Sequence, residues 1–286
     1  MHARYTSYLQ LAPLCLVLLL FVAAPLVFVV IVSFFRTTGF STEPAFSFEN
    51  YASVLSTWLT LRLYLQMAKF ALLTWAACLL IGFFVAYFLV FHVRNRTVAI
   101  GLFLLCTVPF WTSNVIRMIS WLPMLGQHGV VNTVLLELGI IKSPLRWLLY
   151  SDFAVVLAYV HLFTIFMIVP LFNAMSRIDR SLFEAASDAG ASRLQILLQV
   201  VLPLTKSGIA LGSIFVVTLV MGDFYVVKVM SGGGAASVVS AMYDDVSTLL
   251  FPHASASAVL LLLTLTVLVA VMGRFVDVRR ELVSKR

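Results

Sequence analysis

Few residues of this chain have the types and spacing that catalysis or metal binding requires. The sequence contains no H-E-x-x-H, no G-x-S-x-G and no G-x-x-x-x-G-K-[ST] phosphate loop. Its five histidines lack the spacing of metal ligands. Its three cysteines lie in apolar runs without a C-x-x-C pair. We therefore expect no catalytic residue, no metal site, no disulfide framework and no cofactor bound by this chain.

A second chemistry is the binding of a cation by carboxylate and aromatic side chains in long apolar segments. Ionisable groups at membrane depth are costly and usually face a cavity or a partner. Asp223 lies toward the end of one such segment, where its carboxylate would attract an ammonium group. Aromatic ring faces also bind cations. The candidate path residues are Asp223, Trp111, Arg117, Trp121, Tyr159 and Tyr225.

Each of these residues also has an interpretation without a role in transport. Asp223 would then be an aspartate in interfacial water, or the partner of Arg117 or Lys228. The aromatic residues would pack between helices or lie in the aromatic belt of a membrane interface. His161 and Asn173 suit hydrogen bonds between neighbouring helices.

The polar segment at about 175–207 carries two helix-start signatures. SLFE at 181–184 and SRLQ at 192–195 both fit the capping box, in which a serine and an acidic or amide residue satisfy free backbone N–H groups. Gly190 suits the end of the first helix, and Pro203 should end the second. The pattern predicts a short capped helix, a glycine turn and a second short helix.

The same segment resembles the EAA motif of the membrane subunits of binding-protein-dependent ABC importers. That motif reads E-A-A, three residues, G, nine residues, I-x-L-P. Every spacing matches, and Val200 stands where isoleucine is usual. The matching residues are Glu184, Ala185, Ala186, Gly190, Leu202 and Pro203. Local capping roles for Glu184 and Gly190 are compatible with this resemblance, because a capped helix is suited to docking.

The resemblance extends to about residues 65–275. RMISW at 117–121, LGQ at 125–127 and GVVN at 129–132 are similar to the third-span and outer-loop region of putrescine/spermidine permeases. MGDF at 221–224, followed by the glycines at 232–234, is similar to their fifth-span exit. Relatives of that family also carry other solutes, so an opine, an organophosphonate or another amine stays open.

The resemblance implies a type I ABC importer permease fold with a cytoplasmic coupling helix. Glu184 to Gly190 would enter a groove on a separate ATPase subunit, which would bind ATP and magnesium. The implied assembly contains a homologous permease, which forms a heterodimer with this chain. It also contains two ATPase subunits and an external solute-binding protein. ATP-driven closure of the ATPase pair would move the spans as rigid bodies.

The composition identifies the bilayer as the surroundings of these elements. Hydrophobic types make up 62% of the 286 residues and charged types 11%, against roughly 25% charged in soluble domains. This excludes a water-soluble enzyme and a disordered chain. The net charge of +7 fits the bias of Lys and Arg toward cytoplasmic loops, so we expect lipid contact and no nucleic acid.

The apolar segments predict an all-α membrane protein with six transmembrane helices in a single permease domain, residues 1–286. A spanning helix needs about 20 largely apolar residues. The first run exceeds the 7–15 residues typical of a cleaved signal peptide, and we interpret it as a retained span. The expected spans are about 11–35, 63–91, 98–121, 153–174, 208–228 and 256–275. The segment 61–69 could lie along the interface before its span.

The family resemblance implies a bacterial inner-membrane protein. The distribution of basic residues favours an orientation with both termini in the cytoplasm. That orientation places 12 of the 19 Lys and Arg residues on the cytoplasmic side. These are Arg4, Arg94, Arg96, Arg177, Arg180, Arg193, Lys206, Arg274, Arg279, Arg280, Lys285 and Arg286.

Three other classes of function have weaker support in the sequence. An ion-coupled secondary transporter would place carboxylates and broken helices near the membrane midplane. No acidic residue lies near a predicted midplane. An integral-membrane enzyme lacks a catalytic constellation here, and an exporter component or scaffold would not need the EAA spacing.

Overall fold

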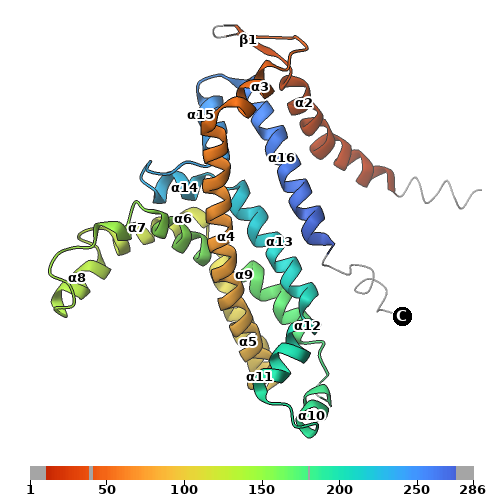
Figure 1. Cartoon of the computed structure of the whole chain (residues 1–286), viewed down its shortest axis with the longest axis vertical. Coiled ribbons are helices and arrows are strands. Elements are labelled where there is room, and N and C mark those ends of the chain that lie inside the picture. The colour runs from red at the N-terminus through yellow and green to blue at the C-terminus, as the bar shows by residue number, and fades with distance from the viewer. Residues whose placement is uncertain (1–10, 39–40, 180, 275–286) are drawn as a thin grey trace, which may run out of the picture. The chain divides into compact units, whose positions relative to one another are not determined.

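The structure is a computed structural model that describes residues 11–38, 41–179 and 181–274. Helices make up nearly all of its regular structure (Figure 1). The chain divides into two compact units, residues 1–63 with 238–264 and residues 64–237 with 265–286. Six of the basic residues used for the orientation lie outside the described residues. These are Arg4, Arg180, Arg279, Arg280, Lys285 and Arg286.

Four described helices are long and apolar enough to cross a membrane. They are Leu11–Val32, Trp58–His92, Asp152–Met175 and Phe251–Gly273. Two bent helix pairs, Arg96–Trp111 with Asn114–Glu137 and Arg193–Leu204 with Lys206–Gly222, raise the number to six if each pair is one span. The six predicted apolar segments therefore all correspond to helical structure, and residue 275 of the last lies outside the described residues.

The third predicted span is not one straight helix. α5 (Arg96–Thr107) and the short 3-10 helix η3 (Val108–Trp111) are followed by a 90° bend into α6 (Asn114–Ile119). Pro109 lies in the first turn of η3 and cannot donate a backbone hydrogen bond, and Thr112 is extended with ψ 153°. The expectation of a continuous helix to residue 121 was wrong because the chain turns at this proline-containing segment.

Two further boundaries differ from the prediction. The fifth span was expected to reach residue 228, but α13 (Lys206–Gly222) ends at Gly222, and α14 (Tyr225–Met230) is a separate helix. Asp223 between them is extended, with φ −94° and ψ 140°. The segment 61–69 is not a separate interfacial helix, because it belongs to the continuous α4 (Trp58–Tyr87).

The first unit contains a small hairpin after the first apolar helix. β1 (Arg36–Thr38) pairs antiparallel with β2 (Ser41–Glu43), with Arg36 opposite Glu43. α3 (Glu49–Ser56) follows, and Arg36 forms a 2.8 Å ion pair with Glu49. The helix Leu11–Val32, which includes η1 (Leu19–Ala23) and α2 (Ala24–Val32), exposes almost all its side chains, as a helix facing lipid would. The unit also includes α15 (Val238–Ser247) and the first part of α16 (Phe251–Gly273).

The second unit is built around α9 (Asp152–Met175), which packs along α13 (Figure 1). Two glycines on α13 allow this close approach. A Cβ on Gly208 would lie 2.7 Å from the Pro170 carbonyl oxygen, and one on Gly212 would lie 2.5 Å from the Met167 sulfur. On the α4 side, a Cβ on Gly82 would lie 2.8 Å from Met167 Cγ. Met167 is therefore enclosed between α4 and α13.

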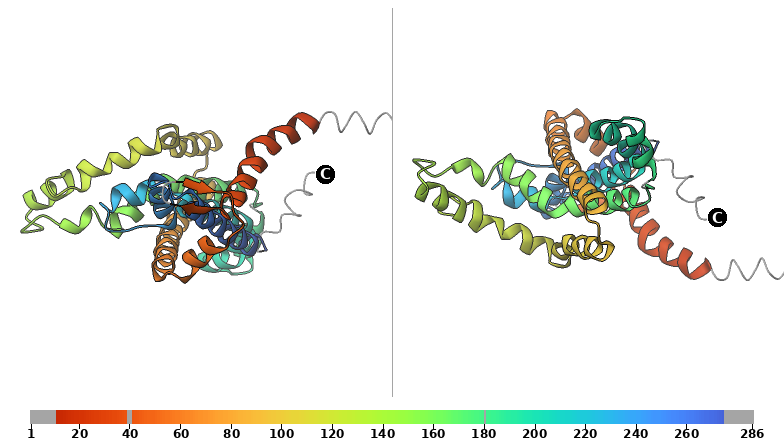
Figure 2. Two further views of the ribbon diagram at one scale, coloured as in Figure 1. Left: turned by 90° about the horizontal axis from the view of Figure 1, so that it is seen from above. Right: turned by 90° about the horizontal axis from the view of Figure 1, so that it is seen from below.

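The remaining helices of this unit are short. They are η2 (Phe88–His92), α7 (Trp121–Leu125), α8 (Val130–Glu137), η4 (Arg146–Leu148), α10 (Ser181–Asp188), α11 (Arg193–Ile196), η5 (Leu197–Val201) and α12 (Leu202–Leu204). Figure 2 shows α7 and α8 projecting from the α9 region. Buried Asn132 orders this projection, because its amide nitrogen donates to the Gly126 carbonyl and its amide oxygen accepts from the Leu145 N–H.

Candidate functional site

The EAA-like segment forms an exposed helix immediately after the end of α9. Glu184 and Ala185 on α10 are exposed, and Ala186 is half-buried. Leu202 and Pro203 lie in α12, at the other end of the segment, and are also exposed. The structure thus presents the outer face of α10 as a free surface within the described residues, which is the geometry that a docking helix requires.

Both ends of α10 are satisfied locally. At its start, the Ser181 backbone N–H donates to Asp179 Oδ1 at 3.0 Å, and this bond lowers the pKa of the Asp179 carboxyl. Ser181 is the first residue of the helix, so the predicted capping role of this serine passes to Asp179. Residue 180 lies outside the described residues.

The end of α10 has the glycine stop that the sequence predicted. Gly190 adopts φ +81°, where only glycine is free of strain. Its N–H donates to the Ser187 carbonyl at 2.9 Å, and the Ala191 N–H donates to the Ala186 carbonyl at 3.0 Å. These two bonds form a Schellman motif, which closes the last turn. The end of the helix is therefore closed by its own backbone groups.

The second short helix is capped as predicted, but Pro203 acts differently. Ser192 and Gln195 form the complete capping box. The helix then passes through the π-helical turn η5 and ends at Leu204, one residue after Pro203. A 66° bend follows at Thr205, whose buried hydroxyl donates to the Val201 carbonyl at 2.9 Å. The bend joins the capped loop directly to α13.

An aromatic contact connects α10 to the end of α4. Phe183 is one of two half-buried side chains on α10, and its ring lies 4.8 Å from that of Phe91 in η2. Phe91 in turn lies 5.1 Å from Tyr87, which stacks on Phe83 at 6.3 Å. The sequence motifs did not predict this contact. The spacing of four residues between Phe83, Tyr87 and Phe91 was the available signal, since it aligns rings along one helix face.

Only two of the six path candidates, Tyr159 and Asp223, are hydrogen-bonded to each other. Fully buried Tyr159 donates to Asp223 Oδ1 at 3.2 Å, and the same oxygen accepts from the Val226 N–H at 2.9 Å. Asp223 therefore caps the start of α14 and fixes Tyr159. Tyr225 is the first residue of α14 and is exposed. Asp223 Oδ1 is already engaged, which its sequence position alone did not reveal.

The second pair joins α7 to α9. Trp121 Nε1 donates to His161 Nδ1 at 2.9 Å, so His161 makes the predicted bond between helices. Arg117 is buried and donates to the Asn114 side-chain oxygen, while its Nε has no partner among the described residues. Trp111 is 76% exposed and belongs to neither pair. Hydrogen bonds between the described residues thus do not join the six candidates into one cluster.

The described residues also limit metal chemistry. No group of three or more His, Cys, Asp or Glu residues in the described ranges could hold a metal ion. Asp245 Oδ2 lies 2.8 Å from His253 Nδ1.

Comparison with known proteins identifies the architecture. Residues 79–282 match the family model described as binding-protein-dependent transport system inner membrane component. The chain belongs to this family. It is a multi-pass inner-membrane permease subunit of an ABC importer rather than an enzyme, and such a subunit works with an ATPase and a solute-binding protein.

Individual relatives support the same assignment. The spermidine/putrescine transport system permease protein PotB of Escherichia coli (strain K12) is 35% identical over 216 residues, covering 75% of this chain and 77% of that protein. The PotB of Haemophilus influenzae is also 35% identical, over 218 residues. The sulfoquinovosyl glycerol transport system permease protein SmoG of Agrobacterium fabrum is 28% identical over 279 residues, covering 87% of this chain and 82% of that protein.

The fold is also that of a solved importer. A chain of a bacterial alginate ABC transporter, in complex with its alginate-bound periplasmic protein, matches with a TM-score of 0.73. It is 15% identical, and the match covers 96% of this chain and 94% of that chain. The predicted type I permease fold is therefore confirmed.

Proposed function

We propose that this permease moves a polyamine such as spermidine or putrescine across the inner membrane. The observation that carries the proposal is the 35% identity to the E. coli spermidine/putrescine permease over 75% of the chain. Asp223, with its carboxylate at the end of α13, adds a negative group in keeping with a cationic solute. The similarity to SmoG supports a second candidate, a permease for another small solute such as a sugar derivative.

The proposed assembly is a heterodimer with a homologous permease, two ATPase subunits that bind ATP and magnesium, and an external solute-binding protein. Both termini lie in the cytoplasm, which puts α10 on the side of the ATPase. The exposed face of α10, from Glu184 to the turn at Gly190, enters a groove on that subunit. Leu202 and Pro203 fix the bend through which the loop joins α13.

The proposed coupling has two routes out of α10 besides its chain connection to α9. One route is the Phe183–Phe91 contact to the end of α4, at 4.8 Å. The other passes through α11 and α12 to the 66° bend before α13. Closure of the ATPase pair would displace α10, and both routes would carry that displacement into the spans as rigid-body motion.

Transport by the purified complex tests the proposal. The permease pair, the ATPase and the cognate binding protein are reconstituted, and ATP-dependent uptake of spermidine, putrescine and sulfoquinovosyl glycerol is measured. Saturable uptake of a polyamine supports the proposal. Uptake of sulfoquinovosyl glycerol alone, together with no binding of polyamines by the cognate binding protein, would refute the polyamine assignment. The family membership would stay intact.

A further inference from the structure

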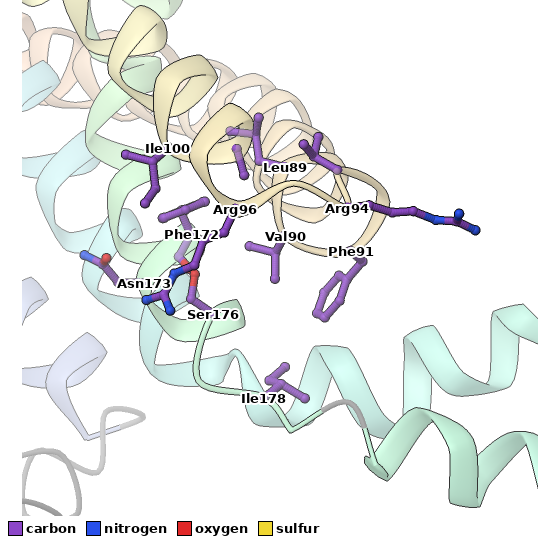
Figure 3. A pocket seen from close by; sticks show the side chains of 12 residues that line it. Leu89, Val90, Phe91, Arg94, Arg96, Ile100, Phe172, Asn173, Ser176 and Ile178 are labelled. Carbon is purple, nitrogen blue, oxygen red and sulfur yellow. The ribbon is translucent and has the colours of Figure 1, made fainter.

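A cavity of about 500 Å³ lies beside the coupling loop and shares only Phe91 with the coupling routes described above (Figure 3). Its walls come from η2, the start of α5 and the end of α9, all within one compact unit. The cavity is therefore at the same end of α9 as α10. In a six-span permease this is the level at which the helices leave the lipid core.

The cavity is chemically divided. Its polar end contains Arg96, Asn173 and Ser176, and Figure 3 shows the Arg96 side chain extending toward the other two. Among the described residues that line it, none is acidic. Arg94 also lines the cavity, with its side chain pointing away from this polar end in Figure 3. The other lining residues are apolar. The apolar lining residues are Leu89, Val90, Phe91, Val93, Ala99, Ile100, Phe172 and Ile178.

The polar groups of the cavity are available to a ligand. Within the described part of the chain, no hydrogen bond or ion pair engages the side chain of Arg96 or the amide of Asn173. Ser176 already donates its hydroxyl to the Phe172 carbonyl at 2.6 Å. A guanidinium with an amide beside it provides several N–H donors, which is the arrangement that binds phosphate oxygens well.

The apolar wall favours a lipid over a free anion. Ile100 is exposed at the cavity, and Leu104, one turn further along α5, is exposed as well. A free phosphate would leave this apolar surface uncovered, whereas an acyl chain would cover it while its phosphate stayed at Arg96. Basic pockets between transmembrane helices at the membrane surface are typical sites for anionic head groups.

We propose that this cavity binds the phosphate head group of an anionic phospholipid, with Arg96 and Asn173 as donors and with an acyl chain along Ile100 and the exposed face of α5. The proposal does not depend on which solute is transported. It requires only that the chain is a membrane permease of this family. The bound lipid would connect the loop between α4 and α5 to the end of α9.

Arg94 provides a matched control. It is two residues from Arg96, carries the same charge and is also exposed, but Figure 3 shows it pointing away from the cavity. Arg96→Gln and Arg94→Gln therefore remove the same charge from the same surface, and only the first removes the guanidinium that extends toward Asn173 and Ser176. Ile100→Gln alters the apolar wall and leaves both arginines in place.

The test measures retention of phosphatidylglycerol and phosphatidylcholine by the purified complex, using native mass spectrometry during lipid titration. We expect preference for phosphatidylglycerol, a loss of about tenfold in Arg96→Gln, and a change under about twofold in Arg94→Gln. Ile100→Gln should also weaken retention. Inorganic phosphate at millimolar concentration should not displace the lipid.

Three outcomes would overturn the proposal. Equal losses in Arg96→Gln and Arg94→Gln would mean that only general surface charge attracts the lipid. Displacement by inorganic phosphate, with no effect of Ile100→Gln, would identify a free anion as the ligand. Equal retention of the two phospholipids by the unmodified complex would show that the cavity does not select an anionic head group. Solute uptake measured in parallel tests the proposed function separately.

Discussion

Removal of the Phe183 ring should uncouple ATP hydrolysis from solute uptake without detaching the ATPase. Phe183 faces Phe91 at a ring-centroid distance of 4.8 Å, on the side of α10 opposite the exposed docking surface. An aromatic pair contributes about 0.5–1.5 kcal/mol beyond its buried area. Since a tenfold change corresponds to about 1.4 kcal/mol, the Phe183→Ala change should lower uptake by about two- to tenfold at a nearly unchanged ATPase rate.

The assay is the ratio of solute transported to ATP hydrolysed in proteoliposomes, measured for Phe183→Ala, Phe91→Ala and the double variant. If the two rings act through each other, the double variant should lose little more than either single one, because one contact is removed in all three. Phe84→Ala is the control, since Phe84 is exposed and its ring meets Phe83 edge-on at 6.4 Å, away from the Phe183–Phe91 contact. Additive losses in the double variant, or an equal loss in Phe84→Ala, would refute this reasoning.

Three other substitutions test particular features. Gly208→Ala should lower the unfolding temperature of the permease in detergent, because the added Cβ would lie 2.7 Å from the Pro170 carbonyl oxygen, at a cost of roughly 1–3 kcal/mol of stability. The control Gly222→Ala should leave the unfolding temperature unchanged, because the space around Gly222 is open. Gly190→Asp should abolish vesicle uptake while membrane insertion persists, since φ +81° disfavours a side chain at the turn. Asp223→Asn removes the charge but keeps an oxygen that can accept from Tyr159. Slower polyamine uptake at unchanged basal ATPase activity would show that the charge acts in transport. Unchanged uptake would show that Asp223 only caps α14.

The sequence was sufficient to predict local structure in the coupling loop. The box at Ser192 and the stop at Gly190 depend on residues within one helical turn, so their types determine their geometry. The six apolar segments were recognisable for a similar reason, because the length of a span follows from bilayer thickness. The 90° bend after Trp111 was not predicted. A proline inside a span, such as Pro109, can be tolerated or can end the helix, depending on its neighbours.

Contacts between distant residues could not be predicted from types and spacing. The bond from Tyr159 to Asp223 joins residues 64 positions apart and changes the interpretation of Asp223 from a free carboxylate to one with an engaged oxygen. The Phe183–Phe91 contact is similarly remote. Such pairs depend on how α9, α13 and η2 pack, and the types and spacing of residues in one sequence do not specify that packing.

The packing of α4, α9 and α13 explains why a displacement of α10 would move all three helices together. Met167 is held between Gly82 and Gly212, where an added Cβ on either glycine would lie 2.8 Å or 2.5 Å from its side chain. Close packing of this kind resists sliding of one helix past another, since interiors at this density are not continuously deformable. Each of the three helices also receives its own connection from the coupling loop. In the proposed coupling, the loop would therefore act on three helices that are already packed together, which favours a rigid-body rotation over the independent movement of single spans.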